Sequence, residues 1–211
     1  MTKQDLSIPQ PAHSISFIMA KRTGMTGKLY DRAAACPSRK LNLTGLVEGP
    51  YGEPASLHSY GTVVLFAGGV GITHQIGQLR ALLSAHDAGT TAVRRITLVW
   101  TVRSTEQLDW VRPWMNEIFA MPGRREVLNL QMYVTKPNNM NEVRSASESV
   151  RMFPGRPKSA LILKEEFDRR VGAMCVGICG PGAMADDVRA GVRGLDMRKG
   201  VVDFWEESFT W

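Results

Sequence analysis

The sequence predicts an α/β fold with a doubly wound parallel β-sheet, preceded by a region of short strands and turns. Three observations lead to this prediction. From residue 62 onward, short apolar segments alternate with segments that carry apolar residues at helical spacing. The apolar segments are continuous, as in strands that helices cover on both faces. The composition, 44% hydrophobic and 22% charged over 211 residues, is that of a globular protein.

The first 60 residues predict mainly strands and turns. Residues 14–18 alternate polar and apolar side chains, which is typical of a strand with one buried face. Pro50 and Pro54 interrupt regular structure near the end of the region. The expected elements are a strand over 14–18, a helix over 27–35, and strand fragments over 41–43 and 46–47.

The remaining residues predict alternating strands and helices. Ser104 and Gln107 form a capping-box pattern at the start of a helix, which Pro113 should kink. Asp186 and Asp187 are expected in the first turn of the last helix, where the helix dipole favours acids. The polar stretch 136–150 predicts a loop. The expected strands are 62–66, 96–100, 128–135, 174–178 and 201–204, and the expected helices cover about 73–85, 104–119, 160–167 and 182 onward.

Composition and charge exclude several classes of protein. The net charge is +6, but the basic pairs are dispersed, whereas nucleic-acid readers concentrate charge on one face. No apolar run approaches the roughly 20 residues that span a bilayer, and the N-terminus lacks the apolar core of a signal peptide. Three cysteines and four histidines form neither a disulfide framework nor a metal-ligand cluster. We therefore expect no nucleic-acid partner, no metal site and no transmembrane helix in this chain.

A glycine-rich turn follows the first strand of the predicted sheet. It consists of Gly68, Gly69, Val70, Gly71, Ile72 and Thr73, and a helix follows it. Glycines let the backbone approach a pyrophosphate, and the helix N-terminus offers free N–H groups. His74 stands where a third glycine of the usual NAD fingerprint would be, so that fingerprint fails. A plain tight turn between strand and helix is the alternative.

Two further strand ends carry candidate binding residues. Arg103 follows the second strand, where an NAD site would have an acid and where an arginine suits a 2′-phosphate. An ordinary exposed arginine is the alternative. Cys179 ends the fourth expected strand beside the turn Gly180-Pro181-Gly182, so its thiol would face the crevice or pack in the core. Cys175 is expected to be a small core residue. The C-terminal Trp211 is expected either to pack as an apolar plug or to stack on a planar cofactor.

In this order, the motifs resemble the ferredoxin–NADP reductase superfamily, within it the ferric-chelate reductase and NADPH oxidase branch, and especially fungal metalloreductases. The resemblance extends from about residue 13 to the end and implies a Rossmann-like nucleotide-binding domain. The matching stretches are 24–26, 48–52, 68–73, 100–103, 155–157, 179–182 with 186–189, and 206–211.

The resemblance implies a role for each candidate residue. Gly24 and Thr26 would hold the FAD pyrophosphate, and Arg103 and Arg156 would contact the adenosine phosphate and ribose of NADPH. Cys179 would align the nicotinamide for hydride transfer to the flavin. Trp211 would stack on the flavin ring and give way when the nicotinamide enters. The cofactor-binding set is Gly24, Thr26, Gly68, Gly69, Val70, Gly71, Ile72, Thr73, Arg103, Arg156, Cys179, Gly180, Pro181, Gly182 and Trp211, of which Cys179 and Trp211 are also the candidate catalytic residues.

The resemblance also divides the chain into two domains. Residues 1–60 would be part of an antiparallel FAD-binding barrel, and residues 61–211 would be the NADPH-binding domain. The His-Pro-Phe-Thr/Ser stretch with which family members bind flavin is not found, so the first barrel strands are expected to be missing. The haem-bearing membrane part is expected to be missing too. Isolated, the chain should bind FAD weakly or not at all.

The implied function is that of the C-terminal NADPH-binding region of a ferric- or cupric-chelate reductase. Hydride would pass from NADPH to FAD, and electrons would pass onward to a metal chelate through the membrane part. The parent family is associated with membranes, with this region on the cytosolic face. The alternatives are a fragment of an NADPH oxidase-type flavocytochrome, which reduces oxygen, and a nucleotide-binding fragment without turnover. A generic NAD-dependent dehydrogenase is disfavoured by the imperfect glycine fingerprint.

Overall fold

The computed structural model describes residues 15–49, 51, 55–139, 143–145 and 147–207. The chain forms two compact units, one up to Gly45 and one from Leu46 onward. The described part of the first unit contains one helix, α1 (Met25–Ala35), which begins after Gly24 and ends shortly before Pro37. No helix among the described residues combines the length and the apolarity that crossing a membrane requires.

The strands predicted in the first unit are not formed. Residues 15–49 contain no strand, and Ile15 and Phe17, which the prediction placed on a buried face, are 68% and 64% exposed. A strand needs a neighbour to complete its backbone hydrogen bonds, and the described part of this unit supplies none. The predicted remnant of an antiparallel barrel is therefore absent from the described residues.

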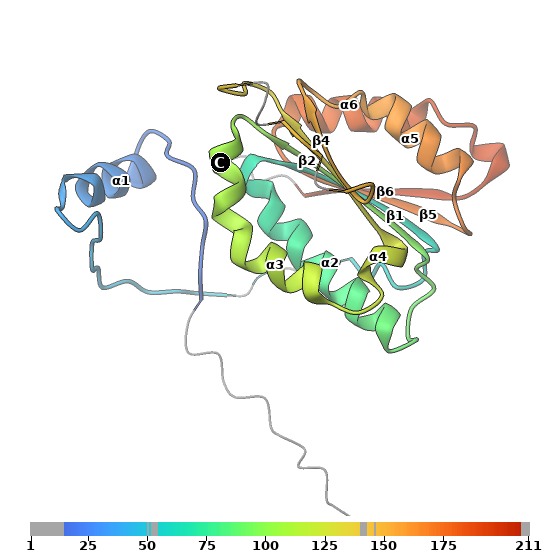
Figure 1. Cartoon of the computed structure of the whole chain (residues 1–211), viewed down its shortest axis with the longest axis horizontal. Coiled ribbons are helices and arrows are strands. Elements are labelled where there is room, and N and C mark those ends of the chain that lie inside the picture. The colour runs from blue at the N-terminus through green and yellow to red at the C-terminus, as the bar shows by residue number, and fades with distance from the viewer. Residues whose placement is uncertain (1–14, 50, 52–54, 140–142, 146, 208–211) are drawn as a thin grey trace, which may run out of the picture. The chain divides into compact units, whose positions relative to one another are not determined.

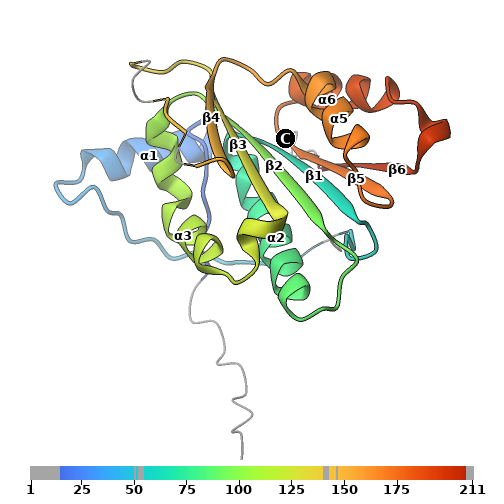
Figure 2. The same cartoon turned by 45° about the vertical axis from the view of Figure 1, so that its right-hand side comes forward.

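The second unit contains a six-stranded, fully parallel sheet in the order β4-β3-β2-β1-β5-β6. Figures 1 and 2 show α2, α3 and α4 on one face of this sheet, and α5 and α6 on the other. The predicted doubly wound α/β architecture is confirmed. Its elements are β1 (Thr62–Gly68), α2 (Ile72–Asp87), β2 (Arg95–Val102), α3 (Arg112–Ala120), α4 (Arg124–Val127), β3 (Leu128–Val134), β4 (Val150–Pro154), α5 (Ser159–Asp168), β5 (Met174–Cys179), α6 (Gly182–Arg193) and β6 (Val202–Glu207), with 3₁₀ turns η1 (Gly69–Gly71), η2 (Thr105–Val111) and η4 (Met197–Lys199).

The edge strand β4 and the start of α3 differ from the prediction. The expected loop over 136–150 ends in β4, a short edge strand that pairs with β3 and stops at Pro154. The capping box is not formed, because Gln107 accepts a hydrogen bond from the Arg103 N–H at 2.8 Å. Residues 105–111 form a 3₁₀ helix, and Pro113 lies in the first turn of α3. A proline there removes no helical hydrogen bond, so the predicted kink does not arise.

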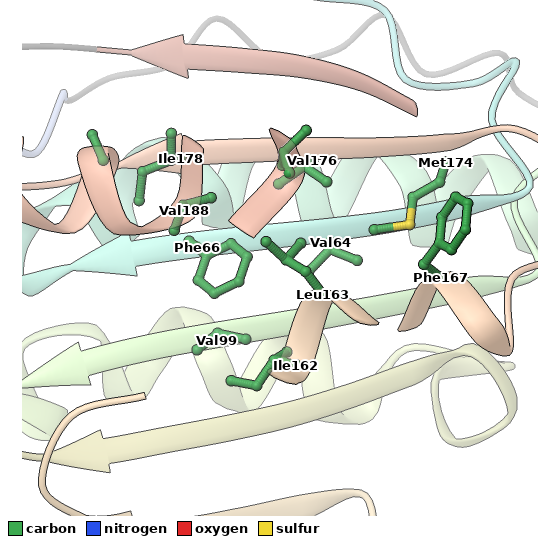
Figure 3. Close-up of a cluster of buried hydrophobic side chains, with 12 residues drawn as sticks. Val64, Phe66, Val99, Ile162, Leu163, Phe167, Met174, Val176, Ile178 and Val188 are labelled. Carbon is green, nitrogen blue, oxygen red and sulfur yellow. The ribbon is translucent and has the colours of Figure 1, made fainter. Parts of the chain in front are cut away.

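The main core lies between the sheet and helices α5 and α6. Figure 3 shows apolar side chains of β1 and β5 meeting those of the two helices. The strands contribute every second residue to this layer, as the two-residue period of a strand requires. The labelled members of the cluster are Val64, Phe66, Val99, Ile162, Leu163, Phe167, Met174, Val176, Ile178 and Val188.

The segment before β1 packs against the sheet unit. Leu57 is buried, and the His58 carbonyl accepts hydrogen bonds from the Ala92 N–H and the Thr91 hydroxyl at 2.8 and 2.9 Å. The compact units divide between Gly45 and Leu46, whereas the motifs predict a domain boundary at 60–61. The hydrogen bonds of the His58 carbonyl tie the segment just before β1 to the loop just before β2.

A partly buried ion pair joins β2 to α5. The Arg95 guanidinium donates two hydrogen bonds to the Glu166 carboxylate, one of them at 2.9 Å, and the Glu166 side chain is 3% exposed. The hydrogen bond to Glu166 raises the pKa of Arg95. Arg95→Ala should destabilise the protein by about 3 kcal/mol, because it leaves a buried carboxylate without a partner.

Urea unfolding of Arg95→Ala and Glu166→Ala would test this. Glu166→Ala should cost less, because the Arg95 side chain is 28% exposed and can reach water. Equal losses in the two variants, or a greater loss for Glu166→Ala, would contradict the interpretation.

Candidate functional site

The order of the strands reverses at β1 and β5, which places the predicted crevice at the carboxyl ends of these two strands. From β1 the chain winds outward through β2, β3 and β4, and then crosses to β5 on the other side of β1. The register pairs Ala67 with Cys179, so the loops that follow β1 and β5 lie side by side. In parallel α/β sheets, ligands bind at such a reversal of strand order. The topology thus brings the two glycine-rich turns of the sequence into one place.

The turn after β1 depends on glycine for two different reasons. Gly69 has a φ of +54°, in the left-handed region that favours glycine, and a Cβ there would meet no atom within 4 Å. Gly71 has ordinary helical geometry, but a Cβ there would lie 2.1 Å from the Cys179 carbonyl oxygen. Gly69 therefore leaves open space beside the backbone, and Gly71 lets α2 approach the end of β5.

The turn after β5 fits against the same glycines. A Cβ on Gly68 would lie 2.5 Å from the Pro181 ring, and one on Gly180 would lie 3.1 Å from the Gly68 nitrogen. The two turns therefore contact each other through bare backbone. The predicted role of these glycines was approach to a ligand, and the structure adds a packing role that the spacing of the motifs did not reveal.

Two helix N-termini begin at these turns. Helix α2 starts at Ile72 and α6 at Gly182, and neither has a side-chain cap or an acidic residue in its first turn. In α2 the Ile72 N–H donates to carbonyls of η1, so the N–H groups without an intrahelical partner lie earlier, in η1. Such N–H groups at a helix start favour an anion. Asp186 and Asp187 lie in the second turn of α6, so their predicted place in the first turn is wrong. Helix α6 begins at Gly182, as predicted, and Asp186 comes four residues later, beyond the first turn.

The thiol of Cys179 is enclosed. Cys179 is 1% exposed, so of the two alternatives, a thiol facing the crevice and a thiol packed in the core, the structure has the second. Burial, together with the charge of Glu207, raises the pKa of Cys179 to about 11. Burial, together with Asp203, raises the pKa of Cys175 to about 12. Both thiols stay protonated at neutral pH, so Cys179 can shape the floor of the crevice but is not a thiolate nucleophile.

Alkylation should therefore separate the three cysteines. At pH 8 in the native protein, iodoacetamide should modify Cys36, which is partly exposed, and leave Cys175 and Cys179 unmodified. Mass spectrometry of the labelled peptides would measure this, and protein unfolded in urea, in which all three should react, is the control. Labelling of native Cys179 as fast as Cys36 would show that its thiol is open to solvent.

Basic side chains follow three adjacent strands at the same edge of the sheet. Arg103 follows β2, Lys136 lies two residues beyond β3 and Arg156 two residues beyond β4, and all three are exposed. Backbone hydrogen bonds continue past the strands, since the Lys136 N–H donates to the Arg103 carbonyl at 2.8 Å and the Gly155 N–H donates to the Val134 carbonyl at 2.8 Å. This basic edge suits a phosphate group. Lys136 was missed because the sequence placed it in a long loop rather than directly after a strand.

The remaining predicted residues belong to the first unit or lie outside the described residues. Gly24, with a φ of +87°, caps the N-terminus of α1 in the first unit, and this helix has no side-chain cap. Thr26 accepts a hydrogen bond from the Arg22 N–H at 3.2 Å. Trp211 lies outside the described residues. Those residues contain no cluster of three or more metal-ligating side chains.

Comparisons with known proteins identify relatives of the chain. The model of the ferric reductase NAD-binding domain family matches residues 60–193, more than half of the chain. A probable ferric reductase transmembrane component of Candida albicans is 23% identical over 90% of this chain and 32% of its own length. Ferric reduction oxidase 8 of Arabidopsis thaliana is 35% identical over 60% of this chain and 18% of its own length.

A solved structure of an NADH-dependent reduced ferredoxin-NADP oxidoreductase is 22% identical, with a TM-score of 0.48 over 87% of this chain and 51% of its own. The chain spans about a third or less of the length of the curated relatives named above. The family match covers β1 to α6, which include both turns and the basic edge. The chain belongs to the family of ferric reductase NAD-binding domains.

Proposed function

We propose that this chain is the NADPH-binding region of a ferric- or cupric-chelate reductase that passes hydride to FAD. The observation that carries the proposal is the meeting of two uncapped helix N-termini at the crevice between β1 and β5, with the basic edge beside it. The first feature suits the pyrophosphate of a dinucleotide and the second suits an additional phosphate. Residues 61–211 would form the NADPH domain.

The glycine turn fits the dinucleotide in shape as well as in charge. Gly69 leaves room for a ligand to approach the backbone, and the first N–H groups of α2 are on the same turn. Residues 68–73 would hold the pyrophosphate. Arg103, Lys136 and Arg156 would hold the 2′-phosphate that distinguishes NADPH from NADH.

The turn after β5 would hold the nicotinamide end. Bound NADPH supplies a hydride, and a bound flavin accepts it. Gly180, Pro181 and Gly182 would contact the ring, and Cys179 beneath them would set its height by packing. In this proposal Trp211 stacks on the flavin and yields to the nicotinamide. The chain's part in the reaction is positioning, which is enough to accelerate a transfer between two cofactors.

FAD would contact the first unit. The N-terminus of α1 has free N–H groups and no acid in its first turn, so Gly24 and Thr26 fit a pyrophosphate. The described part of that unit offers no strands to form a flavin-binding barrel. We propose that residues 1–60 become part of such a barrel only when further strands pair with them, and that this chain alone therefore binds FAD weakly. The same observation favours, as a second candidate, a nucleotide-binding fragment without turnover.

The electron acceptor is proposed from the names of the relatives. Two relatives are named as ferric or ferric/cupric reductase transmembrane components. We propose that electrons leave the flavin through a haem-bearing membrane part and that this region lies at its cytosolic face. A metal chelate would then be the terminal acceptor. Oxygen would be the acceptor in an NADPH oxidase-type flavocytochrome, the alternative within the same branch.

Nucleotide titration of the purified 211-residue chain tests the proposal. Calorimetry should show saturable binding of NADPH and weaker binding of NADH, and FAD should bind weakly or not at all. An equal affinity for NADH and NADPH would contradict the role of the basic edge. The absence of binding by either nucleotide would overturn the proposed function, and a copurifying yellow flavin would overturn the weakness of FAD binding.

A further inference from the structure

A side chain of β2 reaches the glycine turn after β1. The indole Nε1–H of Trp100 donates a hydrogen bond to the Gly69 carbonyl oxygen at 3.0 Å. Trp100 is 1% exposed and is among the largest fully buried side chains. The same carbonyl accepts a hydrogen bond from the Ile72 N–H within the turn. The Gly69 carbonyl oxygen therefore accepts two hydrogen bonds, one from the buried Trp100 indole and one from the Ile72 backbone.

The held carbonyl determines where the next N–H points. In a trans peptide the C=O and N–H groups point in opposite directions. The Gly69 carbonyl points toward Trp100, so the Val70 N–H of the same peptide points away from it. Val70 is the second residue of the 3₁₀ turn that leads into α2, where N–H groups have no intrahelical partner.

We infer that Trp100 is a positioning residue for the dinucleotide site, because its indole N–H fixes the peptide between Gly69 and Val70 with the N–H toward the ligand. The inference rests on the proposed binding of a pyrophosphate at residues 68–73. Rotation of this peptide would change ψ at Gly69, where no Cβ hinders it, and φ at Val70, and the hydrogen bond from Trp100 opposes that rotation. A rotated peptide would present an oxygen to the phosphates and repel them.

The substitution Trp100→Phe tests this, because it keeps an aromatic ring and removes the N–H donor. Its affinity for ADP-ribose, which carries the pyrophosphate, should fall about 3- to 10-fold, as expected for the loss of one hydrogen bond. The affinity for adenosine 2′-phosphate, which has no pyrophosphate, should be unchanged. The matched control is Trp114→Phe on α3, which should bind both probes like the wild-type chain.

If Trp100 had only a structural role, Trp100→Phe would lower the thermal stability but would not change the affinity for ADP-ribose relative to that for adenosine 2′-phosphate. Equal affinities of Trp100→Phe and wild type for ADP-ribose, or equal losses for both probes, would overturn the inference. Failure of the wild-type chain to bind either probe would instead overturn the proposed function.

Because Trp100→Phe removes a buried group, the wild-type chain provides a second measurement. With ¹⁵N-labelled tryptophan, one slowly exchanging indole resonance should shift on addition of ADP-ribose and should stay in place with adenosine 2′-phosphate. A slowly exchanging indole that responds to neither probe would also overturn the inference.

Discussion

Replacing Arg103 with alanine should raise the Kd for NADPH about 10- to 100-fold and leave the Kd for NADH nearly unchanged. Arg103 follows β2, and its carbonyl accepts a hydrogen bond from the Lys136 N–H, so the two exposed residues are neighbours. A 2′-phosphate would accept hydrogen bonds from both side chains. A hydrogen bond to a charged group contributes about 1.5–3 kcal/mol, which corresponds to this range of affinity. Calorimetric titration of both nucleotides measures the change.

Two further variants make the Arg103 result specific. Lys136→Ala should also raise the Kd for NADPH and not that for NADH, but by a smaller factor than Arg103→Ala. The reason is that lysine presents a single charge, whereas arginine presents a planar fork of donors. Arg193→Ala removes an exposed arginine at the last residue of α6 and should change neither affinity. If Arg103→Ala weakened NADH and NADPH equally, the arginine would contact a part common to both nucleotides.

Gly71→Ala should abolish nucleotide binding and destabilise the fold by roughly 1–3 kcal/mol, as overpacking does in well-packed cores. The new Cβ would lie 2.1 Å from the Cys179 oxygen and 2.8 Å from the carbonyl carbon, both of which belong to the backbone of β5. Backbone in the middle of a sheet cannot rotate away like a side chain. The two turns would therefore separate, and the crevice between them would lose its shape.

Gly77→Ala is the matched control for this substitution. Gly77 lies on the same helix, and a Cβ there would meet nothing within 4 Å. Alanine should stabilise α2 by about 0.5–1 kcal/mol, because it restricts the unfolded chain more than glycine does. Chemical unfolding and NADPH titration of both variants test the pair. A Gly71→Ala protein that kept wild-type stability and affinity would show that the contact between the two turns is not needed.

The local sequence was sufficient to predict a strand where the hydrophobic pattern of that strand alone identifies it. The apolar segments predicted β1, β2 and β5, because a strand covered on both faces has no polar alternation. Edge strand β4 was missed since half of its pairing is absent and Pro154 ends it. The strand over 14–18 was predicted wrongly because alternation describes one face of a strand and says nothing about whether a neighbouring strand is present.

The sequence by itself determined the fold class and which turns carry glycine, because backbone geometry and burial select residue types locally. Only the tertiary structure decided that the turns after β1 and β5 pack against each other and that Cys179 lies enclosed beneath them. It also brought Lys136 beside Arg103, and the indole of Trp100 to the Gly69 carbonyl. These contacts join residues more than 30 positions apart, and pairing between parallel strands fixes them, which no local pattern encodes.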